Sequence, residues 1–266
     1  MRFFDQNIWG NYSAPQQIAN RSRLITDMIF DIRPDVCCFQ ECNPKTSRAG
    51  DEPLPRLLQA HYAEAASEYA SRNFTPVFYN RDTVTLRASG YFPFPGRNDG
   101  NSKSITWAVL EDKKSGKAFA ACSVHYWYKN AEEADEWQRV ENARFSANIC
   151  QMIQSEYHVP VFLMGDLNDH PAGPFGGLAL EEMEKLGFRD TRFLAENTTK
   201  EFTWHPAPAM NEQGLYTPGP RPERVLDYIY LYQDGPVRCK RFSVLTDDRA
   251  QASSDHCPLV LDFDLL

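Results

Sequence analysis

The sequence predicts an α/β protein built as a four-layered α/β/β/α sandwich, with two sheets stacked face to face and helices outside. Short apolar runs of strand length occur in both halves of the chain, and helical patterns accompany them in each half. No internal repeat or low-complexity tract divides the 266 residues. A hydrophobic fraction of 42% and a charged fraction of 24% are those of an ordinary globular protein. We therefore expect one domain over residues 1–266.

In the first half, apolar runs predict six strands. They lie at residues 2–9, Val36–Phe39, Val77–Tyr79, Val84–Arg87, Ser104–Leu110 and Ala118–His125. Apolar residues at near-helical spacing predict a helix over 15–32, which Pro34 ends. A short helix is expected over 54–60, after Pro53.

In the second half, the longest helical pattern covers residues 131–157 and precedes a buried strand at Val159–Met164. A further helix is expected over 177–186. The last strands are expected at Val225–Tyr232 and Pro258–Phe263. Two stretches rich in Pro, Gly and Asn, 91–103 and 205–223, are predicted to be long loops, a length that is uncommon unless the loop is functional or disordered.

Composition limits the function classes. A formal charge of −8 argues against broad adhesion to nucleic acid, which needs a basic footprint, although a local basic groove remains open. Seven cysteines without a C-x-x-C pair indicate reduced, buried thiols and a cytoplasmic protein. No run approaches the roughly 20 apolar residues of a membrane span. A secreted form stays open as the alternative, because Met1 could have replaced a signal peptide.

The strongest local motif is Gly165-Asp166-Leu167-Asn168-Asp169, directly after an apolar strand. On an extended chain, residues i and i+2 point the same way, so Asp166 and Asn168 are expected to face one spot. A carboxylate beside an amide can orient a water molecule and donate to an oxyanion. The alternative is a simple turn, because Gly, Asp and Asn all favour turns.

Two further acidic positions stand next to strands. Asp255-His256 precedes the C-terminal strand, where the acid can fix the imidazole tautomer, and the alternative is an ordinary polar loop. Asp227 enters an apolar strand, and an unpaired buried charge there would cost several kcal/mol. Asp227 should therefore meet a metal, a histidine or Arg224, and an ion pair with Arg224 is the purely structural alternative.

Glu41 also lies at a strand end, after Val36–Phe39. Carboxylates and an amide at strand ends make an oxygen-rich site, which selects Mg²⁺ or Mn²⁺ over zinc. Asn7 and His125 complete the set at two more strand ends. A lone histidine at such a position is more often a structural hydrogen-bonding residue than a catalyst.

The order of these motifs resembles the endonuclease/exonuclease/phosphatase family, which includes DNase I-like nucleases, neutral sphingomyelinases, inositol polyphosphate 5-phosphatases and deadenylases. The matching motifs run from Asn7 to Pro258 and read Q-N-I-W-G, P-D-V-x-x-F-Q-E, S-V-H, G-D-L-N-D, L-D-Y-I and S-D-H-x-P-L. The resemblance implies mostly antiparallel sheets.

The resemblance also implies roles for the site residues. Glu41 would be the main metal ligand, assisted by Asn7 and Asp255. Asp166 would activate or orient the attacking water, and Asn168 and His125 would hold phosphoryl oxygens. Asp227 would orient a histidine, and His256 would contact the phosphate as a base or as a transition-state stabiliser. The implied cofactor is Mg²⁺ or Mn²⁺.

The substrate side is less defined. Ser123-Val124-His125 stands where apurinic-site endonucleases of the family carry a tyrosine-containing strand, which favours the histidine-containing branches. Thr203-Trp204-His205 resembles a Thr-Phe-His segment of some bacterial members, or is simply a loop aromatic. The aromatic run Tyr126-Trp127-Tyr128, directly after His125, is expected at the rim of the site. The residues expected to contact the substrate are Trp9, Tyr126, Trp127, Trp204, His205 and Arg224.

Three functions follow. The favoured one is a monomeric, metal-dependent hydrolase of a phosphomonoester or small phosphodiester with a headgroup-type substrate. A DNA or RNA nuclease of the same fold is the alternative, although loop cations such as Lys103 and Arg97 are too sparse to decide it. A non-catalytic binding protein is the third hypothesis, and it should lack one of the polar residues, whereas all of them are present.

Overall fold

The computed structural model describes residues 1–10, 15–48, 53–171, 176–199, 201–205, 210–217 and 224–266. Its strands are β1 (Arg2–Asn7), β2 (Val36–Gln40), β3 (Tyr62–Glu64), β4 (Val77–Asn80), β5 (Val84–Pro93), β6 (Ser104–Asp112), β7 (Ala118–His125), β8 (Val161–Asp166), β9 (Phe188–Asp190), β10 (Asn197–Thr198), β11 (Asp227–Tyr232), β12 (Val237–Val244) and β13 (Leu259–Leu265). Its helices are α1 (Pro15–Ile32), α2 (Leu54–Leu58), α3 (Glu133–Tyr157), α4 (Leu178–Lys185), α5 (Thr191–Leu194) and α6 (Asp248–Ser253), with a 3₁₀ turn at Ser67–Tyr69.

The strands form two sheets. One has the order β10-β12-β13-β1-β2-β4-β3 and the other β5-β6-β7-β8-β11-β9. Strands β1 and β2, β7 and β8, and β10 and β12 pair in parallel, and the other neighbouring strands pair antiparallel. The sheets are therefore mostly antiparallel, as expected.

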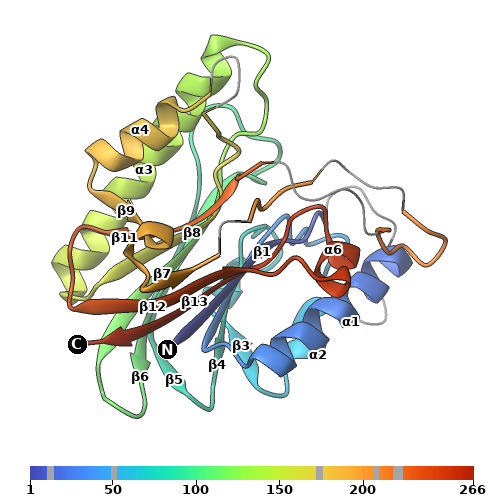
Figure 1. Ribbon diagram of the computed structural model, residues 1–266, viewed down its shortest axis with the longest axis horizontal. Helices are drawn as coiled ribbons and strands as arrows, with labels where there is room; N and C mark the ends of the chain where they lie inside the picture. Colours follow the sequence, from blue (N-terminus) through green and yellow to red (C-terminus); the bar gives the residue numbers. More distant parts are fainter. Residues whose placement is uncertain (11–14, 49–52, 172–175, 200, 206–209, 218–223) are drawn as a thin grey trace.

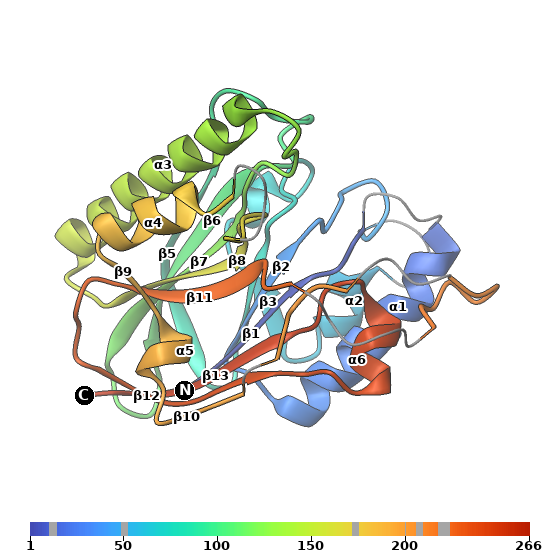
Figure 2. The ribbon, with the colours of Figure 1, turned by 45° about the horizontal axis from the view of Figure 1, so that its top comes forward.

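Helices lie on the outer sides of the two sheets. Helices α3 and α4 lie beside the sheet that contains β6 to β8, and α1, α2 and α6 lie on the far side of the sheet that contains β1 (Figure 1). A view from another angle shows the same separation, with the strands between the two groups of helices (Figure 2). The four-layered α/β/β/α arrangement predicted from the sequence is confirmed.

Strand β1 shows how alternation builds the layers. Phe3 faces the partner sheet, where its ring centroid lies 4.9 Å from that of Phe162 on β8. Phe263 on β13, in the same sheet as Phe3, lies beside it with a centroid distance of 4.6 Å. Phe4 faces the other way and packs in the cluster that includes Ile25 of α1. Both phenylalanines are fully buried, and truncating either one to alanine should cost about 3–5 kcal/mol.

Most element positions match the sequence expectation, and the differences have physical reasons. Strand β5 runs six residues beyond the expected Arg87 and contains a β-bulge between Leu86 and Ala88. The sequence pattern did not indicate this extension, because all but one of the positions after Arg87 are half-buried or exposed. Residues 91–93, expected in a loop, therefore belong to this strand. The expected loop 205–223 falls partly outside the described residues.

Two expectations from composition concern the rest of the chain. All seven cysteines are buried free thiols, as the absence of a C-x-x-C pair indicated. Over the described residues, no helix combines the length and the apolar character needed to cross a membrane.

Candidate active site

Strand pairing brings the predicted residues to one edge of the two sheets. In the parallel pair β7–β8, His125 stands opposite Asp166, and in the antiparallel pair β8–β11, Asp166 stands opposite Asp227. In the other sheet, Asn7 ends β1 opposite Gln40, the residue before Glu41. His125, Asp166 and Asp227, on the adjacent strands β7, β8 and β11 of one sheet, thus lie close to the ends of β1 and β2 in the other sheet.

Asp166 is the centre of this group. Its Oδ2 accepts hydrogen bonds from Asn7 Nδ2 at 2.9 Å and from Asn168 Nδ2 at 3.2 Å, and its Oδ1 accepts from the Asn168 amide at 2.8 Å. His125 Nε2 lies 3.4 Å from the same Oδ2. Although burial opposes its ionised form, the positive charge of His256, the hydrogen bond from His125 and the charge of Lys103 hold the pKa of Asp166 well below its usual value. Asp166 is therefore a carboxylate at neutral pH.

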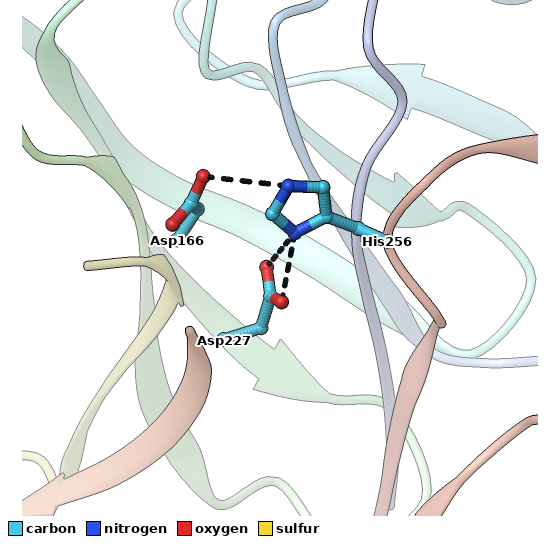
Figure 3. Close-up of side chains that lie close together, drawn as sticks. All are labelled: Asp166, Asp227 and His256. Carbon is cyan, nitrogen blue, oxygen red and sulfur yellow. Dashed lines mark hydrogen bonds and ion pairs between the residues drawn. The ribbon is translucent and has the colours of Figure 1, made fainter. Parts of the chain in front are cut away.

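Asp227 and His256 form the second half of the site (Figure 3). His256 Nδ1 lies 2.9 Å and 3.1 Å from the two carboxylate oxygens of Asp227, and Nε2 lies 3.9 Å from Asp166 Oδ2. Burial disfavours the imidazolium, but Asp227, Asp255 and Asp166 outweigh it and raise the pKa of His256 well above its usual value. The partner of Asp227 is thus a histidine, and Arg224 instead lies with its guanidinium carbon 5.1 Å from the Trp204 ring centroid.

The segment Thr203-Trp204-His205 fixes both halves of this pair. Thr203 Oγ1 accepts hydrogen bonds from the amides of Leu226 and Asp227, at 3.0 Å and 3.1 Å. The Thr203 carbonyl accepts from the Cys257 amide at 2.7 Å, and the His205 amide donates to the Asp255 carbonyl at 3.1 Å. This segment therefore positions the residues before β11 and β13 together.

The backbone at the site is strained. Glu41 and Asn168 have φ angles of 54° and 52°, a left-handed conformation that is costly for residues with a side chain and that often marks functional positions. Gly165, before Asp166, has a φ of 141°, and a Cβ there would lie 2.0 Å from the Val124 carbonyl oxygen. Only glycine therefore fits in the G-D-L-N motif at this position.

The donor set suits a hard cation. Glu41 Oε2 is buried and has no hydrogen-bond partner among the described residues, and Asn7 Nδ2 lies 3.4 Å from Glu41 Oε1. Burial, together with the charges of Glu41 and Asp166, raises the pKa of Asp255 to about 6 against the opposing effect of His256. Crowded oxygen ligands with an orphaned carboxylate atom are what Mg²⁺ or Mn²⁺ would satisfy.

A second set of atoms also converges. Asp166, Asp227 and His256 each bring one donor atom within 4.8 Å of the others. Because both oxygens of Asp227 face the ring nitrogen of His256, this group is better explained as a hydrogen-bonded carboxylate–histidine pair than as a metal site.

These side chains surround a pocket of about 730 Å³. Of the residues predicted from the sequence, its lining includes Trp9, Glu41, Asp166, Asn168, Trp204, Arg224, Asp255 and His256. Asn7, His125 and Asp227 lie directly behind that lining, where they contact Asp166 or His256. A volume in this range suits a small molecule or one unit of a larger one.

The predicted aromatic rim needs correction. Tyr126 is fully buried on the helix side, where its hydroxyl donates to Ser146 Oγ at 3.0 Å. Trp127 is also buried, and its ring nitrogen donates to Asp135 Oδ1 at 2.8 Å. Neither residue lines the pocket. The exposed Tyr128 does instead.

His205 was expected to contact the substrate but lies behind the pocket. It is fully buried, and its Nε2 is 3.2 Å from the Ser254 carbonyl oxygen. Its surroundings are those of a residue that supports the loop before β13. Trp204, the middle residue of the same segment, faces the pocket as expected.

Two further site residues were not assigned a role by the sequence. Thr203 carries the hydroxyl that holds the start of β11, and the T-W-H segment was the signal that pointed near it. Lys103 is only a loop cation in the sequence, but it lies buried with Nζ 2.7 Å from His125 Nε2.

Comparisons with known proteins agree with this arrangement. The model of the endonuclease/exonuclease/phosphatase family matches residues 6–256. A search of curated proteins gave no significant match.

Solved structures with the same fold cover nearly the whole chain. A family protein from Bacteroides vulgatus is 20% identical with a TM-score of 0.72, over 100% of this chain and 98% of that one. The mannosyl-6-phosphatase Bt3783 of Bacteroides thetaiotaomicron is 18% identical with a TM-score of 0.74, over 99% of each chain. TDP2 of D. rerio, complexed with a single-strand DNA product, is 17% identical with a TM-score of 0.69, over 99% of this chain and 98% of that one.

The matched segment begins one residue before Asn7 and ends at His256, so it contains every site residue described above. The chain belongs to the endonuclease/exonuclease/phosphatase family, whose members are phosphoester hydrolases.

Proposed function

We propose that this protein hydrolyses a small phosphomonoester or phosphodiester with the help of Mg²⁺ or Mn²⁺. One observation carries the proposal. The ionised Asp166, Glu41 with its orphaned carboxylate oxygen, and His256 backed by Asp227 are brought together at a single pocket. This combination offers an acceptor for a proton of the attacking water, a positively charged hydrogen-bond donor and a ligand for the cation at one place.

Glu41 would hold the cation, with Asn7 and Asp255 assisting. The donor chemistry fits, because all three residues offer oxygen ligands. Burial, and to a lesser degree the charges of Glu41 and Asp166, raises the pKa of Asp255, so a cation would stabilise its carboxylate. When bound, the cation would neutralise charge on the phosphoryl oxygens.

Asp166 would accept a proton from the attacking water as the water oxygen bonds to phosphorus and the ester P–O bond breaks. His256, held by Asp227, would act as an imidazolium that donates from Nε2 to a phosphoryl oxygen, which favours the transition-state stabiliser over the base. Asn168 would donate from its amide, and His125 would support the phosphoryl group from the other side of Asp166. The departing oxygen would take up a proton from solvent.

The pocket favours a small ester over a polymer. Its described lining holds five cationic side chains, Lys45, Arg72, Lys103, Arg224 and the protonated His256, against four carboxylates, Glu41, Asp99, Asp166 and Asp255. A polymer that binds through several phosphates needs a predominantly basic track. Trp9, Trp204 and Tyr128 at the wall suit the apolar face of a sugar or another headgroup. The similarity to a mannosyl-6-phosphatase is compatible with this class of substrate.

A nuclease activity is the competing function, and the similarity to a protein complexed with single-strand DNA supports keeping it. The two are separated by measuring turnover of p-nitrophenyl phosphate, bis-p-nitrophenyl phosphate, and single-stranded and duplex DNA and RNA across a salt series. We expect a small ester to be the fastest substrate, with weak salt dependence. Faster cleavage of nucleic acid, falling steeply with salt, would promote the nuclease instead.

A further inference from the structure

Lys103 is a buried lysine that the proposed chemistry does not use. It directly precedes β6 and is 3% exposed. Its backbone is fixed, because its amide donates to Asn98 Oδ1 at 3.1 Å and its carbonyl accepts from Asn98 Nδ2 at 2.8 Å. Burial lowers the pKa of Lys103 to about 8, opposed by the charges of Glu41 and Asp166. The side chain is therefore still an ammonium at neutral pH.

The contacts of this ammonium include no direct ion pair among the described residues, although Glu41, Asp166 and Asp99 lie near enough to favour its charge. Nζ lies 2.7 Å from His125 Nε2 and 5.1 Å from the ring centroid of Tyr128. Among the residues that the structure describes, no carboxylate oxygen lies within ion-pair distance of Nζ. Between these carboxylates and Lys103 stands His125, whose Nε2 lies 3.9 Å from Glu41 Oε1 and 3.4 Å from Asp166 Oδ2. A desolvated ammonium without an anion is costly, so it calls for a ligand.

The position of Lys103 supplies a place for that ligand. Lys103 lines the same pocket as Asp166, Asn168 and His256. An ammonium has three donors and no acceptor, and a phosphoryl oxygen is its natural partner. A purely structural role would be met by a carboxylate partner or by a neutral residue of similar volume.

We propose that Lys103 is a further substrate-binding residue, whose ammonium binds a non-bridging oxygen of the phosphoryl group in the active-site pocket. The inference rests on the proposed function and adds a residue to it. The ligand chemistry is a phosphate dianion or monoester, and inorganic phosphate is the simplest probe of it.

The test compares Lys103→Met with Lys129→Met. Lys129 is exposed, does not line the pocket, and approaches the same tyrosine, with Nζ 5.9 Å from the Tyr128 centroid. Calorimetric titration with inorganic phosphate should give a Kd that is about 10- to 100-fold higher for Lys103→Met, because a hydrogen bond to a charged group is lost. The Kd of Lys129→Met should equal that of the wild type.

Titration with Mn²⁺, followed by its paramagnetic resonance signal, separates binding from structural support. Removing a positive charge near Glu41 should leave the Mn²⁺ affinity of Lys103→Met unchanged or tighter. Parallel weakening of phosphate and Mn²⁺ binding would assign Lys103 a structural role and overturn the proposal. Lys103→Gln serves as a second neutral variant. If neither Lys103→Met nor Lys103→Gln folds, Lys103 has a structural role and the proposal is overturned.

The readout does not depend on turnover, so it stands apart from the hydrolase proposal. A wild-type protein that binds phosphate but hydrolyses no ester would contradict the proposed function and leave the role of Lys103 measurable. A wild-type protein that binds no phosphate, or a Lys103→Met Kd within twofold of the wild-type value, would overturn the inference.

Discussion

Replacing Asp255 by asparagine should stabilise the cation-free protein at high pH. Asp255 is 7% exposed, and burial together with Glu41 and Asp166 raises its pKa from 3.8 to about 6. This rise costs the ionised form about 3 kcal/mol. Because the folded-state pKa is the higher one, the contribution of Asp255 to stability is present below pH 3.8 and is lost as pH rises through 6.

Urea unfolding in EDTA measures the effect. At pH 8, Asp255→Asn should unfold with a free energy up to about 3 kcal/mol above that of the wild type, and at pH 4.5 most of this gain should be absent. Asp248→Asn, which alters an exposed carboxylate at the start of α6, is the matched control and should change stability by no more than about 0.5 kcal/mol.

Added Mg²⁺ should reverse the order of stability of the wild type and Asp255→Asn at pH 8. A cation at Glu41 and Asp255 removes the cost of their crowding, so saturating Mg²⁺ should stabilise the wild type at pH 8 more than it stabilises Asp255→Asn. Two results would refute the reasoning. In EDTA, Asp255→Asn could be no more stable than the wild type at pH 8, or its gain in unfolding free energy over the wild type could be as large at pH 4.5 as at pH 8.

Two further predictions concern individual side chains. Asp166→Asn and His256→Ala should each lower kcat by at least about 100-fold, measured as turnover of protein whose fold is checked by circular dichroism, and wild-type turnover in either variant would remove that residue from the mechanism. His256→Ala should also lower the free energy of unfolding by several kcal/mol, because it leaves the buried Asp227 without its partner. Tyr126→Phe, which loses the buried hydroxyl contacts to Ser146 Oγ and Met183 Sδ, should lower stability by about 1 kcal/mol and leave kcat/KM unchanged. Tyr128→Ala should instead raise KM at unchanged stability, and the opposite pattern would restore the predicted place of Tyr126 at the rim.

The elements with clear apolar periodicity were predictable from the sequence. Helix α1 has the expected bounds, and β2 and β8 lie within one or two residues of expectation, because their apolar residues are continuous or follow the helical period. Strand β12 was not predicted. Its outward positions carry Arg238 and Arg241, and such polar strands are recognisable only from their partners.

The site was predictable as a set of residues but not as a geometry. Glu41, Asp166 and Asp227 were identified because polar residues end buried strands, whereas the pairing of Asp227 with His256 depends on the register of β8 with β11 and on the bracing by Thr203. The burial of Lys103 is likewise a property of the folded chain.

Tyr126 is a different case. Along β7, Phe119, Ala121 and Ser123 face the other sheet, while Val124 packs on the helix side, so alternation sends Tyr126 away from the face of His125. The alternation was readable in the sequence, and applying it beyond His125 would have predicted the buried position of Tyr126.

The most direct test of metal-dependent phosphoester hydrolysis is turnover of small phosphoesters by protein stripped with EDTA and then titrated with Mg²⁺ or Mn²⁺. The stripped protein should be inactive, and either cation should restore activity along a saturation curve that Glu41→Gln shifts to higher metal concentration. Full turnover after exhaustive chelation would contradict the account.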